Sequence, residues 1–374
     1  MKNSKFITYS NSGVNYRDLD PAKKLAQEGA LKTSGNLKKN GYKEISDSRG
    51  ESAFVWQQGN ILMASVIEGL GTKNLVADIT AQITGKTYYD IIGHDTVATI
   101  INDLISVGAK PLTINAYWAV GQSDWFKNTK RTKDLIRGWG NACNLAGVTW
   151  GGGETPTLKG IVREESIDLG GSAIGIISPK RNLITDKKLQ IGDRIILFKS
   201  NGINANGLSL ARALAKNLPK GYATKLPSGK IYGEALLTKT NIYAKLVQDL
   251  LNAGVDIHYI SNITGHGLRK IMRGRSNFTY IIERMFDPQE IFLFIQKHAN
   301  LSDYEMYQTF NMGMDYALFI PKKNIEKTQK IITKSKFQNI DAGYVEKGKR
   351  QVIIKPKNII FSKNTLRVRQ IISH

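Results

Sequence analysis

The chain has 374 residues, of which 41% are hydrophobic and 9% aromatic, so it can bury sizeable cores and is not disordered throughout. A chain of this length usually forms two domains or one large one. Its single cysteine, Cys143, excludes an internal disulfide, a cysteine-rich zinc site and a CxxC redox motif. No apolar run approaches the ~20 residues that a membrane span needs, and the first residues show no apolar signal segment. We therefore expect a cytoplasmic protein that does not enter a membrane.

The 53 lysine and arginine residues against 31 aspartate and glutamate residues give a formal net charge of +22. Such a charge suits nucleic acid, an acidic membrane surface or a polyanionic small substrate. The basic residues are spread along the chain without a basic arm, which favours a solvated, lysine-rich surface. The tightest basic cluster consists of Arg269, Lys270, Arg273 and Arg275.

The first half of the chain predicts mixed strands and helices after a polar, turn-rich segment over residues 1–50. Apolar residues at helical spacing, from Val97 to Ile105, indicate a helix over residues 88–107, which Gly108 ends. The other expected elements are strands at 53–56, 61–67, 112–116 and 172–177, a helix at 129–145, and a strand that enters a glycine run at 151–155.

A lysine-rich connector at 180–192 suggests the domain boundary, giving domains 1–180 and 181–374. After it, a buried strand at 193–198 precedes a loop rich in asparagine and glycine. The remaining expected elements are helices at 208–218, 233–251, 288–297 and 324–333 and strands at 278–282, 316–320 and 340–345. Each half mixes strands and helices without strict alternation, which predicts two α/β (or α+β) domains.

A glycine-rich loop, Glu68 to Lys73, follows the apolar strand at 61–67. Glycines let a backbone approach an anion closely, and the terminal lysine adds a positive charge. A carboxylate beside such a loop suits Mg²⁺, which takes one or two carboxylates plus phosphate oxygens. The alternative is a glycine hairpin turn with a solvated lysine. Residues 85–87 end like a Walker A loop, but Thr80 stands where its first glycine is required, so we reject that motif.

Acidic and amide side chains accompany the helix at 88–107. Asp95 and Asn102 are seven residues apart and share a helix face, while Asp103 is turned about 100° toward the flank. These groups form either a solvated edge or a site for Mg²⁺ and phosphate. The three glycines at 151–153 cost conformational entropy unless the backbone must approach something. Glu154 after them is a candidate ligand, with a wide turn as the alternative.

Three further turns stand in the second half, at 200–207, 262–267 and 309–313. The second opens a helix, whose N-terminal amides could hold a phosphate, and the basic cluster follows it. Each turn could equally be a simple connection. The sequence shows no Ser-His-Asp set and no histidine-rich metal spacing, and we expect His258 and Cys143 to be core residues.

In this order and spacing, these segments resemble the aminoimidazole ribonucleotide synthetase (phosphoribosylformylglycinamidine cyclo-ligase) family of a wider ATP-binding superfamily. The matching segments are Ser12 to Tyr16, Glu68 to Lys73, Asp95 to Val97 with Asn102 and Asp103, Gly152 to Thr155, Asn206 and Gly207 with Ser209 and Leu210, Ile263 to Gly265, and Thr309 to Gly313. The chain departs from the family pattern in having Glu68 for aspartate, Asn204 and Asn262 for histidine, and His266 for glycine. These departures indicate a divergent branch.

The resemblance implies that N-terminal strands form a dimer barrel, that an α/β domain packs beside it, and that ATP and Mg²⁺ lie in the cleft. The implied metal-facing carboxylates are Glu68, Asp95, Asp103 and Glu154. The residues that would place the nucleotide are Gly69, Gly71, Thr72, Lys73, Asn102, Gly152, Gly153 and Thr155. The implied catalytic residues are Lys73, Asp95 and Asn204, and the substrate side would comprise Asn206, Gly207, Thr264, Gly265 and Asn311. On this basis Lys73→Ala should lose ATP turnover while staying folded.

The family reaction converts formylglycinamidine ribonucleotide and ATP to aminoimidazole ribonucleotide, ADP and phosphate through an iminophosphate. The expected partners are thus a phosphoribosyl substrate and a second copy of the chain, with no nucleic acid and no membrane. One alternative is a superfamily relative acting on another small substrate, although the lone Cys143 disfavours the thiol-using relatives. The others are a non-catalytic paralogue and a basic nucleic-acid-binding module, which would bind with steep salt dependence.

Overall fold

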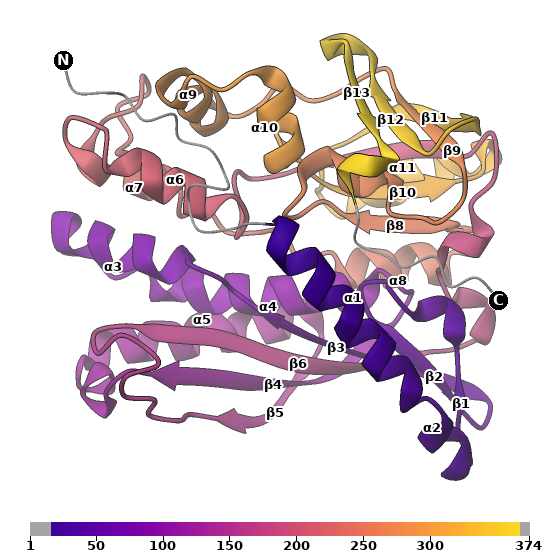
Figure 1. Cartoon of the computed structure of the whole chain (residues 1–374), viewed down its shortest axis with the longest axis horizontal. Coiled ribbons are helices and arrows are strands. Elements are labelled where there is room, and N and C mark those ends of the chain that lie inside the picture. Colours follow the sequence, from indigo (N-terminus) through magenta and orange to yellow (C-terminus); the bar gives the residue numbers. More distant parts are fainter. Residues whose placement is uncertain (1–15, 367–374) are drawn as a thin grey trace.

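The computed structural model describes residues 16–366, and its two halves each contain a sheet, with helices between and around the sheets (Figure 1). Of the expected loop from Ser12 to Tyr16, only Tyr16 lies within the described residues. Helices α1 (Tyr16–Lys32) and α2 (Gly35–Lys39) occupy the segment that we expected to be turn-rich, so that expectation is wrong. α1 contains Pro21 and many charged residues, and its side chains from residue 21 onward are mostly exposed, so its sequence has the polar composition of a loop.

The first half contains a six-stranded sheet in the order β1-β2-β3-β6-β4-β5. Helices α3 (Lys73–Thr84), α4 (Tyr89–Ile105) and α5 (Thr129–Ala146) all lie on one side of it, toward the second half (Figure 1). On β3, Val66 faces the helices and is buried, whereas Ile67 on the opposite face is 78% exposed. The strands are β1 (Lys43–Glu44), β2 (Phe54–Gln58), β3 (Ile61–Gly69), β4 (Lys110–Val120), β5 (Thr149–Glu154) and β6 (Ile167–Ile177).

The second half contains a seven-stranded sheet in the order β13-β12-β9-β11-β7-β10-β8, in which only the β12–β9 pair is parallel within the described residues. Its strands are β7 (Arg194–Lys199), β8 (Tyr259–Asn262), β9 (Phe278–Ile282), β10 (Met314–Ile320), β11 (Asn339–Lys347), β12 (Gln351–Ile354) and β13 (Ile359–Ser362). Its helices are α6 (Leu208–Ala215), α7 (Tyr232–Ala235), α8 (Ala244–Asn252), α9 (Glu290–Ala299), α10 (Asp303–Thr309) and α11 (Ile325–Lys334).

The single long helix expected at 233–251 is wrong, because the chain leaves helical geometry between α7 and α8. The intervening residues direct backbone groups toward the first half: the Thr238 carbonyl accepts from Lys73, and the Thr240 amide donates to Asp95. β-Branched residues such as these threonines are also weak helix formers. Contacts with a distant segment therefore override the local apolar pattern.

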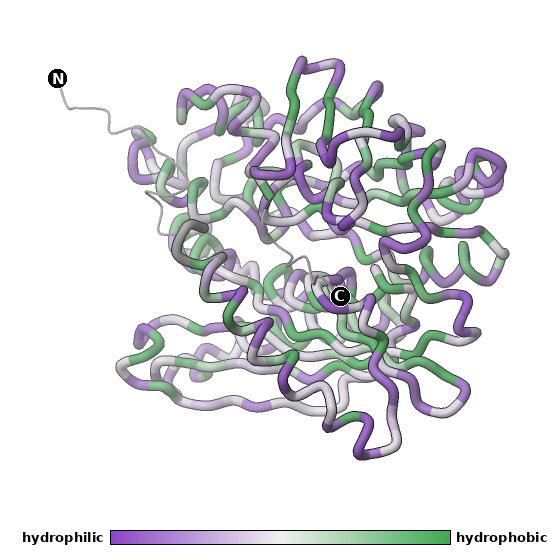
Figure 2. Tube along the Cα trace, turned by 45° about the vertical axis from the view of Figure 1, so that its right-hand side comes forward, coloured by the Kyte–Doolittle hydropathy of each residue, from purple (hydrophilic) through white to green (hydrophobic). Residues whose placement is uncertain are grey.

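Apolar residues recur along the strands and inner helices of both halves, while hydrophilic residues gather in the peripheral loops (Figure 2). The proposed domain boundary after residue 180 falls between the end of β6 at Ile177 and the start of β7 at Arg194. Tight packing joins α4 to α5, where Gly93 lies so close to the Leu135 carbonyl that an added Cβ would stand 2.5 Å from its oxygen. α4, which carries Asp95, Asn102 and Asp103, is thus held closely against α5.

Candidate functional site

A cavity of about 1620 Å³ lies between the two halves. One wall comes from α1, from the end of β3 and from α4. The other wall comes from the second half, chiefly from residues 262–277 and from residues 363–366 near the end of the described chain. This volume exceeds the ~300–1,000 Å³ of ordinary small-ligand pockets, so it has room for two ligands together. Among the predicted site residues, those on its surface are Glu68, Gly69, Asp103, Asn206, Thr264 and Gly265.

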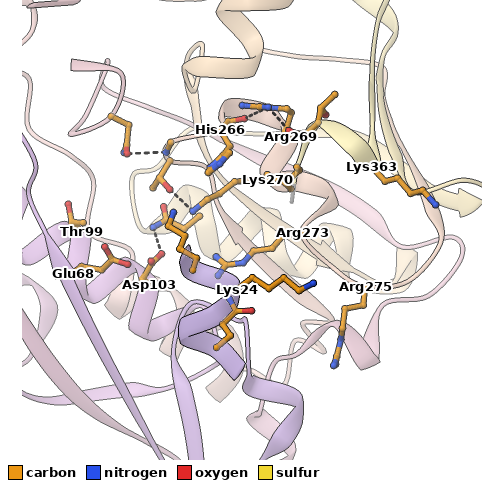
Figure 3. A pocket seen from close by; sticks show the side chains of 18 of the residues that line it. Lys24, Glu68, Thr99, Asp103, His266, Arg269, Lys270, Arg273, Arg275 and Lys363 are labelled. Carbon is orange, nitrogen blue, oxygen red and sulfur yellow. Dashed lines mark hydrogen bonds between the residues drawn. The ribbon is translucent and has the colours of Figure 1, made fainter. Parts of the chain in front are cut away.

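Two carboxyl groups meet on the first wall of the cavity. Glu68, at the end of β3, and Asp103 of α4 both line the cavity, and Figure 3 shows the two side chains close together. The Asn262 side-chain amide donates to the Asp103 Oδ1 atom at 2.8 Å. Burial first, and then the negative charge of Asp103, raise the pKa of Glu68 to about 7. Two adjoining carboxylates that repel one another form a favourable place for a cation.

A turn and a short 3₁₀ helix (Gly267–Met272) form the facing wall. The Gly265 amide donates to the Asn206 Oδ1 atom at 3.0 Å, which joins two of the predicted substrate-side turns. Lys270 donates from its ammonium to the Thr264 hydroxyl, and burial lowers its pKa to about 8. His266 lines the cavity with a φ of 99°, and burial followed by the charge of Lys270 lowers its pKa to about 3.

Lys73 and Asp95 lie together, but away from the lining of this cavity. Both side chains are fully buried and form an ion pair. Lys73 also donates to the Thr238 carbonyl at 2.7 Å, while the second Asp95 oxygen accepts from the Thr240 amide at 2.9 Å. The pair therefore fastens α3 and α4 to the segment between α7 and α8.

Asn102 has a similar position on α4. Its side-chain amide donates to the Asn241 carbonyl at 2.7 Å, and its oxygen accepts from the Tyr243 amide at 3.1 Å. Gly71, with a φ of 77°, and Thr72 lead into α3 without lining the cavity. The helix face that Asp95 and Asn102 were predicted to share is thus real, and it docks on the second half.

The glycine run before Glu154 lies in a different place. Gly152, Gly153, Glu154 and Thr155 line a separate hollow of about 320 Å³ beside two tryptophans. An added Cβ at Gly153 would stand 2.4 Å from the Ala116 carbonyl oxygen, so the close approach that three glycines predict is to the neighbouring strand β4. Within residues 16–366, no group of three or more histidine, cysteine, aspartate or glutamate side chains could hold a metal ion. The four predicted carboxylates are thus divided among three places.

The remaining substrate-side residues support the cavity wall from behind. Asn204, buried with a φ of 58°, donates to Asp315 at 2.9 Å, and Asn311 donates to the Gly202 carbonyl at 2.9 Å. Gly207, with a φ of 75°, packs so tightly on Phe310 that an added Cβ would stand 2.2 Å from its ring. Of this turn, only Ala205 and Asn206 line the cavity.

Sequence reasoning missed several cavity residues, chiefly Lys23, Lys24, Thr99, Arg350 and Lys363. The residues of α1 gave no signal because that helix is polar, mostly exposed and contains Pro21. The basic cluster at 269–275, which the sequence did indicate, lines the cavity. Its arginines donate to protein groups: Arg269 to the carbonyls of His266, Gln308 and Thr365, Arg273 to the Gly50 carbonyl and the Ser52 hydroxyl, and Arg275 to the Asp186 carboxylate.

Two expected core residues are where the sequence placed them. His258 is buried and hydrogen-bonded to Asp193 at 2.8 Å, and Cys143 is buried in α5. In the part of the chain that the structure describes, the helices are too short or too polar for any of them to cross a membrane.

Comparison with known proteins gives matches over both halves. The family model "AIR synthase related protein, N-terminal domain" matches residues 50–177, and "AIR synthase related protein, C-terminal domain" matches residues 190–355. The phosphoribosylformylglycinamidine cyclo-ligase of Methanothermobacter thermautotrophicus is 31% identical over 328 residues, which cover 87% of this chain and 91% of the relative. That of Clostridium perfringens is 31% identical over 353 residues, covering 93% of this chain and 100% of the relative.

Solved structures show the same fold at low identity. The hydrogenase maturation protein HypE in complex with ATP has a TM-score of 0.58 and 16% identity, covering 84% of this chain and 88% of that one. Thiamine-monophosphate kinase from Stenotrophomonas maltophilia has a TM-score of 0.57 and 15% identity, covering 81% and 88%. These matches confirm the predicted two-domain fold class. Together with the family models and the cyclo-ligase relatives, they show that the chain is a divergent member of the AIR synthase (phosphoribosylformylglycinamidine cyclo-ligase) family.

Proposed function

We propose that this protein is an ATP-dependent ligase that closes the imidazole ring of aminoimidazole ribonucleotide from formylglycinamidine ribonucleotide in purine biosynthesis. The observation that carries the proposal is the similarity to cyclo-ligases along nearly their whole length, up to 100% of the relative. The cavity between the two halves supports the proposal, because its volume of about 1620 Å³ can hold a nucleotide and a phosphoribosyl substrate side by side.

The chemistry needs positioning and charge neutralisation rather than a protein nucleophile. The substrate amide oxygen attacks the γ-phosphorus of ATP, and the bond from that phosphorus to the ADP oxygen breaks. The amidine nitrogen then attacks the activated carbon, the ring closes, and phosphate leaves with the former amide oxygen. The turns at 205–206 and 264–265 would hold the substrate on the second wall, opposite Glu68 and Asp103.

Glu68 and Asp103 fit Mg²⁺, which in nucleotide sites takes one or two carboxylates together with phosphate oxygens. Their closeness in the cavity and the raised pKa of Glu68 support this choice, because a cation would relieve the repulsion between them. When bound, the ion would neutralise charge on the ATP phosphates. Ligation by Asp95 or Glu154, and nucleotide placement by Gly71, Thr72, Asn102 and residues 152–155, stay predictions from the motif match.

We also propose that the protein is a cytoplasmic homodimer. Helices α3, α4 and α5 cover one face of the six-stranded sheet (Figure 1), and apolar side chains are exposed on the opposite face. On it, Ile67 of β3 is 78% and Tyr117 of β4 38% exposed, and neither strand is at an edge of the sheet. A second copy of this face would cover them, in line with the barrel that the family resemblance implies.

An assay of ADP release tests the enzymatic proposal. Purified protein with formylglycinamidine ribonucleotide, ATP and Mg²⁺ should release ADP and form aminoimidazole ribonucleotide, whereas omission of the ribonucleotide should abolish release. Intact ATP binding without ADP release would contradict the proposed reaction. It would favour a relative that acts on another substrate, or a non-catalytic paralogue.

A further inference from the structure

The cavity contains a lysine that the motif comparison did not single out for catalysis. The motif assigns the phosphate-neutralising charge to Lys73, but that side chain is fully buried. Its ammonium already donates to the Asp95 carboxylate and to the Thr238 carbonyl. A ligand in the cavity would have to open the contact between the two halves to reach it.

Lys270 has the location that Lys73 lacks. It projects from the 3₁₀ helix Gly267–Met272 into the cavity, on the wall opposite the carboxyl pair (Figure 3). Lys270, Glu68 and Asp103 all line this one cavity and lie near one another in Figure 3, so the three groups can act on the same ligand. Its ammonium donates to the Thr264 hydroxyl, which leaves two of its three hydrogens for other acceptors.

The arginines beside Lys270 are already committed to protein groups. Arg269 donates to the Gln308 carbonyl at 2.9 Å and to the carbonyls of His266 and Thr365. Arg273 donates to the Gly50 carbonyl at 3.0 Å and to the Ser52 hydroxyl at 2.8 Å. Arg273 thus joins the cavity wall to the first half and Arg269 connects parts of the second half, whereas the Lys270 side chain donates to Thr264.

We propose that Lys270 is the catalytic cation that contacts the γ-phosphoryl group of ATP while it is transferred. This inference rests on the proposed ligase function and assigns the cationic contact within that site. The transferred group would lie between the carboxyl pair on one wall and the lysine on the other. Lys270 stays protonated and moves no proton in the step; it stabilises the negative charge that spreads over the phosphoryl oxygens.

The test compares Lys270→Met, Lys270→Arg and Lys270→Ala with the wild-type protein. Lys327→Met serves as matched control, because Lys327 is an exposed lysine of α11 outside the cavity. We measure kcat/KM for ATP by ADP release, the dissociation constants of ATP and ADP, and the melting temperature. Lys270→Met should lower kcat/KM roughly 10- to 100-fold, the effect of losing one charged hydrogen bond. It should weaken ATP binding more than ADP binding, since ADP lacks the γ-phosphate.

Two further readouts separate contact with the phosphate from a structural role. Lys270→Arg should keep part of the activity that Lys270→Met loses, and added ethylammonium should restore activity to Lys270→Ala in a saturable way. Equal losses in the Met and Arg variants, accompanied by equally lowered melting temperatures, would overturn the inference. Wild-type kcat/KM in Lys270→Met would overturn it too, while leaving the ligase function in place. A wild-type protein that neither binds ATP nor releases ADP would instead refute the proposed function, and this inference with it.

Discussion

Replacing Lys73 by methionine separates the interpretation of the motif from that of the structure. The motif predicts lost ATP turnover in a folded protein. The structure predicts unfolding at lower temperature, because the change leaves the buried Asp95 carboxylate without its cation and the Thr238 carbonyl without a donor. Removing one partner of a buried pair costs about 3–5 kcal/mol. In a domain of 150–250 residues each kcal/mol lowers the melting temperature by roughly 2–4 °C, so we expect a fall of about 6–20 °C.

Calorimetry and circular dichroism would follow the melting of Lys73→Met, with the exposed Lys327→Met as control. Adding Asp95→Asn should recover much of the loss, because asparagine is neutral and still offers an oxygen to the Thr240 amide. A Lys73→Met variant that melts within about 2 °C of the wild type but no longer binds ATP would refute this reasoning. It would show that Lys73 leaves its buried partner to contact the nucleotide.

Two other predictions follow from the same structure. Ile67→Asp places a charge on the exposed face of the six-stranded sheet and should convert the proposed dimer to a monomer. Light scattering after size-exclusion chromatography would detect this change as a halved mass. An unchanged mass would place the dimer interface elsewhere. Burial raises the pKa of the Asp315 carboxyl from its ordinary 3.8 to about 6. The folded state therefore binds the carboxyl proton more tightly than the unfolded state, and the free energy of unfolding falls as the pH rises between these two values. Asp315→Asn should therefore flatten the dependence of the melting temperature on pH between about 4 and 6, and an unchanged slope would contradict the assignment.

The elements that sequence reasoning located well are those with a buried stripe and a clear stop. The helix expected at 129–145 is α5, Thr129–Ala146, and Gly147 ends it with a φ of 66°. The helix expected at 88–107 is α4, whose apolar positions are buried along most of its length. The segment 233–251 failed because its middle is held by bonds to residues such as Lys73, 165 positions away in the chain, which no local pattern contains.

The site residues, like the secondary-structure elements, divide into those that local motifs locate and those that long-range packing places. Local motifs brought Glu68 and Asp103 to attention, and the fold does place them together at the cavity. Local motifs could not show that Lys73 faces inward to Asp95, or that the glycines before Glu154 are required by the strand beside them. The type of a side chain is visible in sequence; the wall toward which it points is set by long-range packing.

The location of the excess positive charge indicates more about the ligand than its sum does. Basic side chains from α1, from the 3₁₀ helix and from residues 350–363 converge on one concave cavity, where Glu68 and Asp103 are the carboxylates on the lining. A surface that binds nucleic acid would present such charges outward, along an exposed face or an open groove. Convergence on one concave cavity instead favours a small substrate with several phosphates, the third of the partners that the net charge of +22 allowed. Most of the remaining lysines are exposed and solvated, so the fold gathers only part of the positive charge around this cavity and its two carboxylates.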